Sequence, residues 1–126
     1  MNRVFKVSED REILASEWGD NDNPLVIMLH GGGQTRHSWK GVAAKIANLG
    51  FHVIAHDLRG HGESFWDHDG DYTFDAHRDD LVRIIQQLGK KASLVGASLG
   101  GMISLSLAGH EEESKYCSGL IMVDIG

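Results

Sequence analysis

The sequence predicts an α/β fold, an open and mostly parallel sheet with helices on both faces and an antiparallel hairpin at its start. Four short apolar runs have the length of strands buried in a sheet. Three stretches with helical periodicity lie between these runs, and two partly alternating segments open the chain. Alternation of strands and helices is typical of a parallel sheet with right-handed crossovers.

The opening hairpin is predicted at residues 4–7 and 12–18, which are separated by the polar sequence SEDR. A polar loop at residues 19–24 leads into the continuous apolar run LVIML at residues 25–29, the first strand of the parallel part. Three further strands are expected at residues 51–57, 92–98 and 119–124.

The first helix is predicted from an apolar stripe, and Gly50 can end it in a left-handed conformation. The stripe consists of Trp39, Val42, Ala43, Ile46 and Leu49. The third helix, at residues 99–109, is apolar almost all round, as expected for a helix enclosed by the protein.

The second helix has a clear start signal, since Thr73 can cap it and Asp75 lies in its first turn. Its buried face is expected to contain Phe74, His77, Leu81, Ile84, Ile85 and Leu88. Four polar residues are expected on the solvent side: Arg78, Asp80, Arg83 and Gln87.

Composition limits the classes of function. The length of 126 residues fits one domain. The formal net charge of -6 provides no positive potential that would attract nucleic acid. A single cysteine, Cys117, excludes an intramolecular disulfide and a C-x-x-C site. No apolar run is long enough to span a bilayer, and the first residues lack a signal-peptide pattern. We expect a cytoplasmic protein with neither nucleic acid nor a membrane as a partner.

Ser98 lies between Gly96 and Gly100, where a predicted strand turns into a predicted helix. Ligands and catalytic groups collect at the carboxyl ends of strands in such sheets. A sharp turn there needs small residues on either side and holds the serine hydroxyl outward. The alternative is a serine that only caps the helix, beside glycines that only allow close packing.

Two further loops follow neighbouring strands in the same way. The sequence LHGGG, residues 29–33, is a glycine loop whose backbone can present N–H groups, and HDLRGHGES occupies residues 56–64. Packing alone does not explain why glycine-containing motifs follow three predicted strands, each at the carboxyl end of its strand. In the second of them, Arg59 and His61 are expected to brace the glycine turn rather than touch a substrate.

With these motifs in the order LHGGGQTRHSW, HDLRGHGES, LVGASLGG and LIMVDIG, the chain resembles the amino-terminal half of α/β-hydrolase-fold enzymes, in the branch of esterases and perhydrolases. The resemblance implies that Ser98 is the nucleophile and that the N–H groups of Leu99 and Gly32 form the oxyanion hole. It also implies that His30 organises the loop. Gly33 is a second candidate for the donor of the loop, because a triple glycine leaves the register open.

The resemblance implies hydrolysis of a small-molecule ester or related carbonyl substrate through an acyl-enzyme, with no cofactor and no metal. Epoxide hydrolases and haloalkane dehalogenases similarly carry the Asp-x-Arg-Gly-x-Gly-x-Ser stretch found at residues 57–64. These enzymes use an aspartate nucleophile, so Ser98 argues against both activities.

A serine needs a base, and in these hydrolases the order is serine, acid, histidine. The only histidine after Ser98 is His110, which the intervening helix carries about 15 Å away. Asp124 is a possible acid, and otherwise orders its loop.

We therefore expect residues 1–126 to form a single hydrolase core domain that stops before the last strands and any lid. The chain is then either an amino-terminal fragment, inactive alone, or a natural short form that binds a ligand without catalysis. Its last strand would be an exposed apolar edge, which favours self-association.

Overall fold

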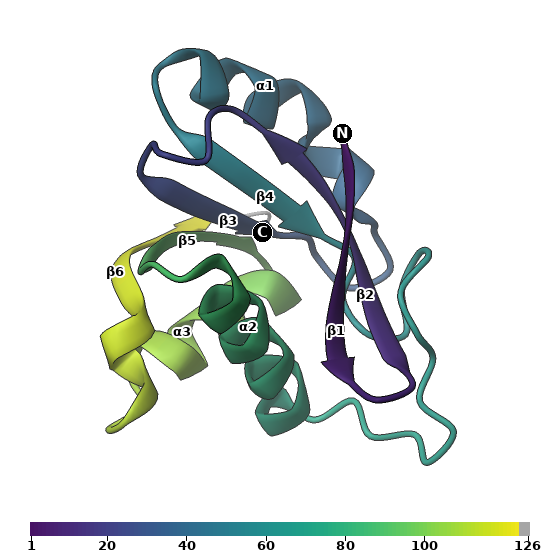
Figure 1. Cartoon of the computed structure of the whole chain (residues 1–126). Coiled ribbons are helices and arrows are strands. Elements are labelled where there is room, and N and C mark those ends of the chain that lie inside the picture. The colour runs from purple at the N-terminus through teal and green to yellow at the C-terminus, as the bar shows by residue number, and fades with distance from the viewer. Residues whose placement is uncertain (124–126) are drawn as a thin grey trace.

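The computed structural model describes residues 1–123 and contains one six-stranded sheet with helices around it (Figure 1). The strands are β1 (Asn2–Ser8), β2 (Arg11–Trp18), β3 (Leu25–Leu29), β4 (His52–His56), β5 (Ala92–Ala97) and β6 (Cys117–Val123). The α-helices are α1 (Lys40–Asn48), α2 (Phe74–Leu88) and α3 (Leu99–Ala108), and two short 3₁₀ helices are η1 (Arg36–Trp39) and η2 (Glu113–Tyr116).

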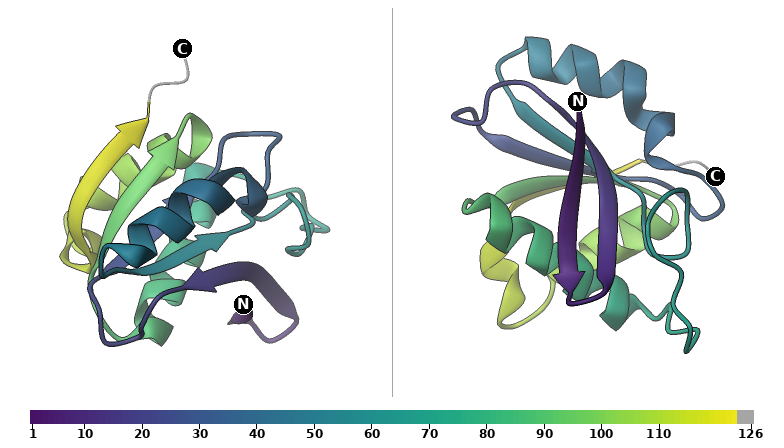
Figure 2. Two further views of the ribbon diagram at one scale, coloured as in Figure 1. Left: turned by 90° about the horizontal axis from the view of Figure 1, so that it is seen from above. Right: turned by 45° about the vertical axis from the view of Figure 1, so that its right-hand side comes forward.

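The strand order is β1-β2-β4-β3-β5-β6. The last four strands in this order are parallel to one another, whereas β1 pairs antiparallel with β2 and β2 antiparallel with β4. Helix α1 covers one face of the sheet, and α2 and α3 cover the other (Figure 2). The predicted fold class, including the opening hairpin, is therefore confirmed.

Two apolar cores lie on the two faces of the sheet. The larger core joins strand residues such as Ile27 and Leu94 to α2 and α3, and the smaller joins Met28 and Val53 to Ala43 of α1. Every residue of β3 and β4 is buried, because both strands are covered on both faces. This explains why β3 is a continuous apolar run, and why β4 does not alternate between apolar and exposed polar residues although it begins and ends with a buried histidine.

The predicted helix signals are present. The Thr73 hydroxyl accepts a hydrogen bond from the N–H of Ala76, 3.2 Å away, and Asp75 lies in the first turn of α2. Gly50, just after α1, has the predicted left-handed conformation with φ +101°.

Several predicted positions are wrong. Asp80 was expected in solvent but is only 4% exposed, because Arg59 reaches it from the loop after β4 with two hydrogen bonds. Phe74, Val42 and Leu49 were expected on buried faces but are 48%, 48% and 78% exposed. Val42 and Phe74 lie in the first turns of α1 and α2, where their neighbours Ala43 and Ala76 are buried instead, and Leu49 directly follows α1.

Element boundaries also differ from the prediction. Trp39 belongs to η1 and precedes α1, and β6 begins at Cys117, two residues earlier than expected. The exposed apolar edge that the sequence predicts is present, since Ile121, Met122 and Val123 of β6 are 61%, 47% and 38% exposed. Within residues 1–123, no helix is long and apolar enough to cross a membrane.

Candidate active site

Ser98 occupies the turn between β5 and α3. Its φ of +52° and ψ of -114° lie in a region that L-residues rarely adopt, and no other non-glycine residue among residues 1–123 has a positive φ. The side chain is exposed and makes no capping hydrogen bond to α3. The turn therefore presents a free hydroxyl and does not use it as a cap, so the alternative of a capping serine finds no support in the geometry.

Gly96 and Gly100 allow this turn because backbone surrounds both positions. A Cβ on Gly96 would lie 2.4 Å from the carbonyl oxygen of Gly100, and a Cβ on Gly100 would lie 2.2 Å from the carbonyl oxygen of Leu29. Contacts under 3 Å do not occur for real Cβ atoms. The small residues that the motif predicts are thus required by the approach of α3 to β5 and to the end of β3.

The glycine loop after β3 lies against the amino-terminus of α3. A Cβ on Gly32 would be 3.8 Å from the Leu99 side chain, and one on Gly31 would be 3.5 Å from the carbonyl oxygen of Ala97. Leu99 is the first residue of α3, so its N–H has no partner within the helix. The structure thus brings Gly32, Ser98 and Leu99 to one edge of the sheet.

His30 joins the glycine loop to the loop after β4. The imidazole is fully buried, its Nε2 accepts the N–H of Leu58 at 3.1 Å, and its Nδ1 donates to the carbonyl oxygen of Gly31 at 2.7 Å. Burial lowers the pKa of His30, which favours the neutral ring that this pattern requires.

The two candidate donors of the loop differ in their hydrogen bonds. The N–H of Gly33 donates to Nε2 of His61, 3.1 Å away, and Gly33 has a φ of +78°. The N–H of Gly32 has no hydrogen-bond partner among residues 1–123. In this conformation Gly32 is the glycine with a free donor.

A buried ion pair between Arg36 and Asp57 supports the same two loops. The Arg36 side chain is 2% exposed and the Asp57 side chain is fully buried. The carboxylate of Asp57 accepts hydrogen bonds from the guanidinium and the N–H of Arg36 and from the N–H of Glu63, the last two at 2.7 and 3.0 Å.

Burial opposes ionisation of Asp57, but the backbone hydrogen bonds from Arg36 and Glu63 and the charge of Arg36 outweigh it, so its pKa lies below the usual value. Sequence reasoning missed this pair. The signal available was an arginine in the glycine-loop motif and an aspartate directly after a buried strand.

Arg59 and His61 were predicted to brace the glycine turn in the loop after β4. Nδ1 of His61 lies 3.0 Å from the carbonyl oxygen of Arg59 within this turn, whereas the guanidinium of Arg59 makes its contacts outside it. Nε and Nη2 of Arg59 donate to the two carboxylate oxygens of Asp80 at 2.7 and 2.8 Å, and Nη1 donates to the carbonyl oxygen of Asp71 at 2.9 Å. The loop after β4 is therefore fastened to α2 as well as to the glycine loop.

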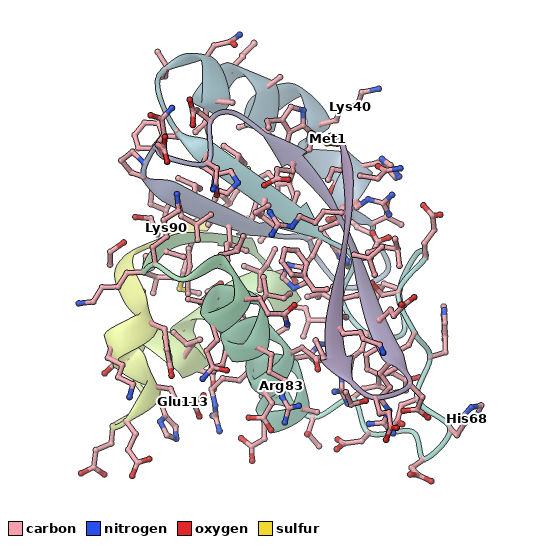
Figure 3. All side chains as sticks on the ribbon, viewed as in Figure 1. Met1, Lys40, His68, Arg83, Lys90 and Glu113 are labelled. Carbon is pink, nitrogen blue, oxygen red and sulfur yellow. The ribbon has the colours of Figure 1, made fainter. Side chains whose placement is uncertain are left out.

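Two further residues that the sequence analysis considers are His110, which is expected far from Ser98, and Asp124, a possible acid. His110 follows α3 at its far end, where its Nδ1 accepts the N–H groups of Glu112 and Glu113, and Figure 3 shows Glu113 there, beyond α3. Asp124 lies outside the described residues. Within residues 1–123, no group of three or more His, Cys, Asp or Glu could hold a metal ion.

The fold and the site together define a class of α/β proteins, in which a residue on a strained strand-to-helix turn lies near a glycine loop at the carboxyl edge of a parallel sheet. The profile of the alpha/beta hydrolase fold matches residues 24–125. The chain belongs to the α/β-hydrolase-fold family.

Relatives and solved structures agree with this assignment. The chain is 39% identical over 114 residues to an esterase of Mycobacterium tuberculosis, a match that covers 90% of the chain and 36% of the relative. It is 34% identical over 91 residues to a bifunctional esterase/perhydrolase of Acinetobacter calcoaceticus, covering 71% and 33%. The chain thus spans about a third of the length of these relatives.

Among solved structures, a thioesterase domain from the curacin biosynthetic pathway superposes with a TM-score of 0.87 at 29% identity, covering 98% of this chain and 45% of that one. A haloalkane dehalogenase variant from Bradyrhizobium elkanii gives a TM-score of 0.83 at 28% identity, covering 97% and 39%. Because enzymes with different chemistry share this fold, the activity must be argued from the site.

Proposed function

We propose that this chain is the amino-terminal part of a serine hydrolase that cleaves an ester or a related carbonyl compound through an acyl-enzyme. The observation that carries the proposal is the conformation of Ser98, an exposed serine held at positive φ beside the amino-terminus of α3. The relatives described as esterases support a hydrolase of this kind.

In the proposed reaction, Oγ of Ser98 attacks the carbonyl carbon and its proton passes to a base. The carbonyl oxygen becomes an oxyanion, which accepts hydrogen bonds from the N–H groups of Leu99 and Gly32. Loss of the alcohol leaves an acyl-serine, and water then releases the acid and restores the hydroxyl. His30 and the Arg36–Asp57 pair hold the glycine loop in place.

Among residues 1–123, no hydrogen bond joins Oγ of Ser98 to a histidine, because the nitrogens of His30 and His61 contact backbone groups and His110 is at the far end of α3. We propose that a histidine in a C-terminal continuation, oriented by a carboxylate, is the base, and Asp124 stays a candidate for that carboxylate. An aspartate nucleophile, as in haloalkane dehalogenases and epoxide hydrolases, is excluded at this position by Ser98.

The distant His110 also favours a second candidate, a protein of the same fold that binds a ligand without turning it over. In that case the glycine loop would hold a carbonyl or carboxylate oxygen, and Ser98 would form no covalent bond.

The test compares two polypeptides, the 126-residue chain and the same chain continued through its own reading frame to the length of its relatives. We expect the longer polypeptide to hydrolyse p-nitrophenyl esters and to be labelled by a fluorophosphonate at Ser98. We expect Ser98→Ala to abolish both, and the 126-residue chain to show little turnover.

Serine-dependent turnover in the 126-residue chain would show that the exclusion of His110 as base is wrong. A longer polypeptide that binds an ester product but is not labelled would favour the second candidate.

A further inference from the structure

We propose that His61 is a positioning residue, which fastens Gly33 so that Gly32 supplies the free N–H of the glycine loop. This inference rests on the proposed function, because it concerns the oxyanion donors of that same site. It begins from the hydrogen bond between the N–H of Gly33 and Nε2 of His61, 3.1 Å long.

The partners of His61 define the position of its proton. A backbone N–H can only donate and a carbonyl oxygen can only accept. Nε2 faces the N–H of Gly33, and Nδ1 lies 3.0 Å from the carbonyl oxygen of Arg59. The ring that satisfies both contacts is neutral, with its proton on Nδ1.

The glycine loop needs such an anchor because residues 31–33 are three consecutive glycines, the residue type with the greatest backbone freedom. Gly31 is held on both sides, since its N–H donates to Oε1 of Gln34 at 3.0 Å and its carbonyl oxygen accepts from His30 and from the N–H of Gln34. The His61 contact holds Gly33. Gly32 is left between two fixed glycines, with its own N–H free among the described residues.

His61 is itself held by contacts with the backbone of Leu58 and Arg59. Its N–H donates to the carbonyl oxygen of Leu58 at 3.0 Å, and the carbonyl that its ring contacts belongs to Arg59, whose guanidinium is paired with Asp80 of α2. Its ring also lies 4.9 Å from that of His30, centre to centre. The two histidines therefore join the glycine loop to the loop after β4 at two adjacent points.

The structural half of the proposal can be tested on the ¹⁵N-labelled 126-residue chain by NMR. We expect His61 to carry its proton on Nδ1 and the Gly33 amide to exchange with solvent about tenfold more slowly than the Gly32 amide, because a hydrogen bond protects it. His61→Ala should raise the Gly33 rate to that of Gly32, and His61→Gln, which keeps an acceptor oxygen, should restore part of the protection.

The control is His68→Ala, which removes an exposed histidine at the tip of the same loop (Figure 3) and should leave both rates unchanged. A proton on Nε2 of His61 in the unaltered chain would overturn the proposal even if His61→Ala does not fold. Equal exchange rates for Gly32 and Gly33 would also overturn it.

The catalytic half is tested in the C-terminally continued polypeptide. We expect His61→Ala to lower kcat about 10- to 100-fold with little change in KM, since the donor is misplaced and not removed, and we expect His61→Gln to recover part of the loss. Unchanged kcat in His61→Ala would overturn the positioning role.

A continued polypeptide with neither turnover nor labelling of Ser98 would instead refute the proposed function. The exchange and ring-proton measurements would then still decide whether His61 fastens Gly33.

Discussion

Asp57→Asn tests most directly how the Arg36–Asp57 ion pair holds the glycine loop after β3 and the loop after β4 together. The carboxylate of Asp57 is fully buried and bonded to the guanidinium of Arg36, which is itself 2% exposed. The amide that replaces it has no charge, and its NH₂ group would face the N–H groups of Arg36 or Glu63, which now donate to the carboxylate. The variant therefore leaves a buried cation without its main partner.

The expected loss follows from the burial of the pair. Removal of one partner from a buried ion pair lowers the free energy of unfolding by about 3–5 kcal/mol, because the remaining charge stays desolvated. A domain of this size has about 5–15 kcal/mol in total, so the loss is a large part of it.

Urea denaturation followed by circular dichroism measures this loss. With a slope of about 2 kcal/mol per molar urea, the midpoint should fall by about 1.5–2.5 M. The matched control is Glu63→Gln, because Glu63 contacts the same guanidinium at 2.9 Å but its side chain is 66% exposed. Solvent screens that contact, so the control should lose less than about 1 kcal/mol.

The reasoning would be refuted if Asp57→Asn and Glu63→Gln shifted the midpoint by similar small amounts. That result would mean that burial of the carboxylate does not decide the strength of the pair.

Three further outcomes are expected. Burial lowers the pKa of His56 to about 3 and that of His77 to about 4, below the usual value near 6.5, so on acidification the unfolded chain takes up these protons first. Stability measured by urea denaturation should thus be full above about pH 6.5 and fall below it by about 1.4 kcal/mol per pH unit for each histidine, down to about pH 4 for His77 and about pH 3 for His56, and a flat profile from pH 7 to 5 would contradict this. Gly96→Ala should destabilise the chain by at least about 2 kcal/mol in the same assay, since its Cβ would meet the backbone of Gly100 and cannot be accommodated by a side-chain movement. Ser98→Gly should raise the thermal midpoint, because glycine adopts φ +52° without the strain of about 1–3 kcal/mol that serine bears there, whereas Ser98→Ala should not raise it.

The sequence by itself determined the fold class, the succession of strands and helices along the chain, and the turn at Ser98. These features are local, since a continuous apolar run, a helical stripe, the Thr73 cap or a Gly-x-Ser-x-Gly turn is encoded by neighbouring residues. Their positions could be predicted because short-range geometry leaves few alternatives.

Only the tertiary structure decided which distant groups meet. The burial of Asp80 by Arg59 and the pairing of Arg36 with Asp57 each join residues 21 positions apart, and the hydrogen bond from Gly33 to His61 joins residues 28 apart. Which of these residues is buried, and which glycine keeps a free N–H, depends on the approach of loops that follow different strands. No periodicity or spacing within one segment contains that information.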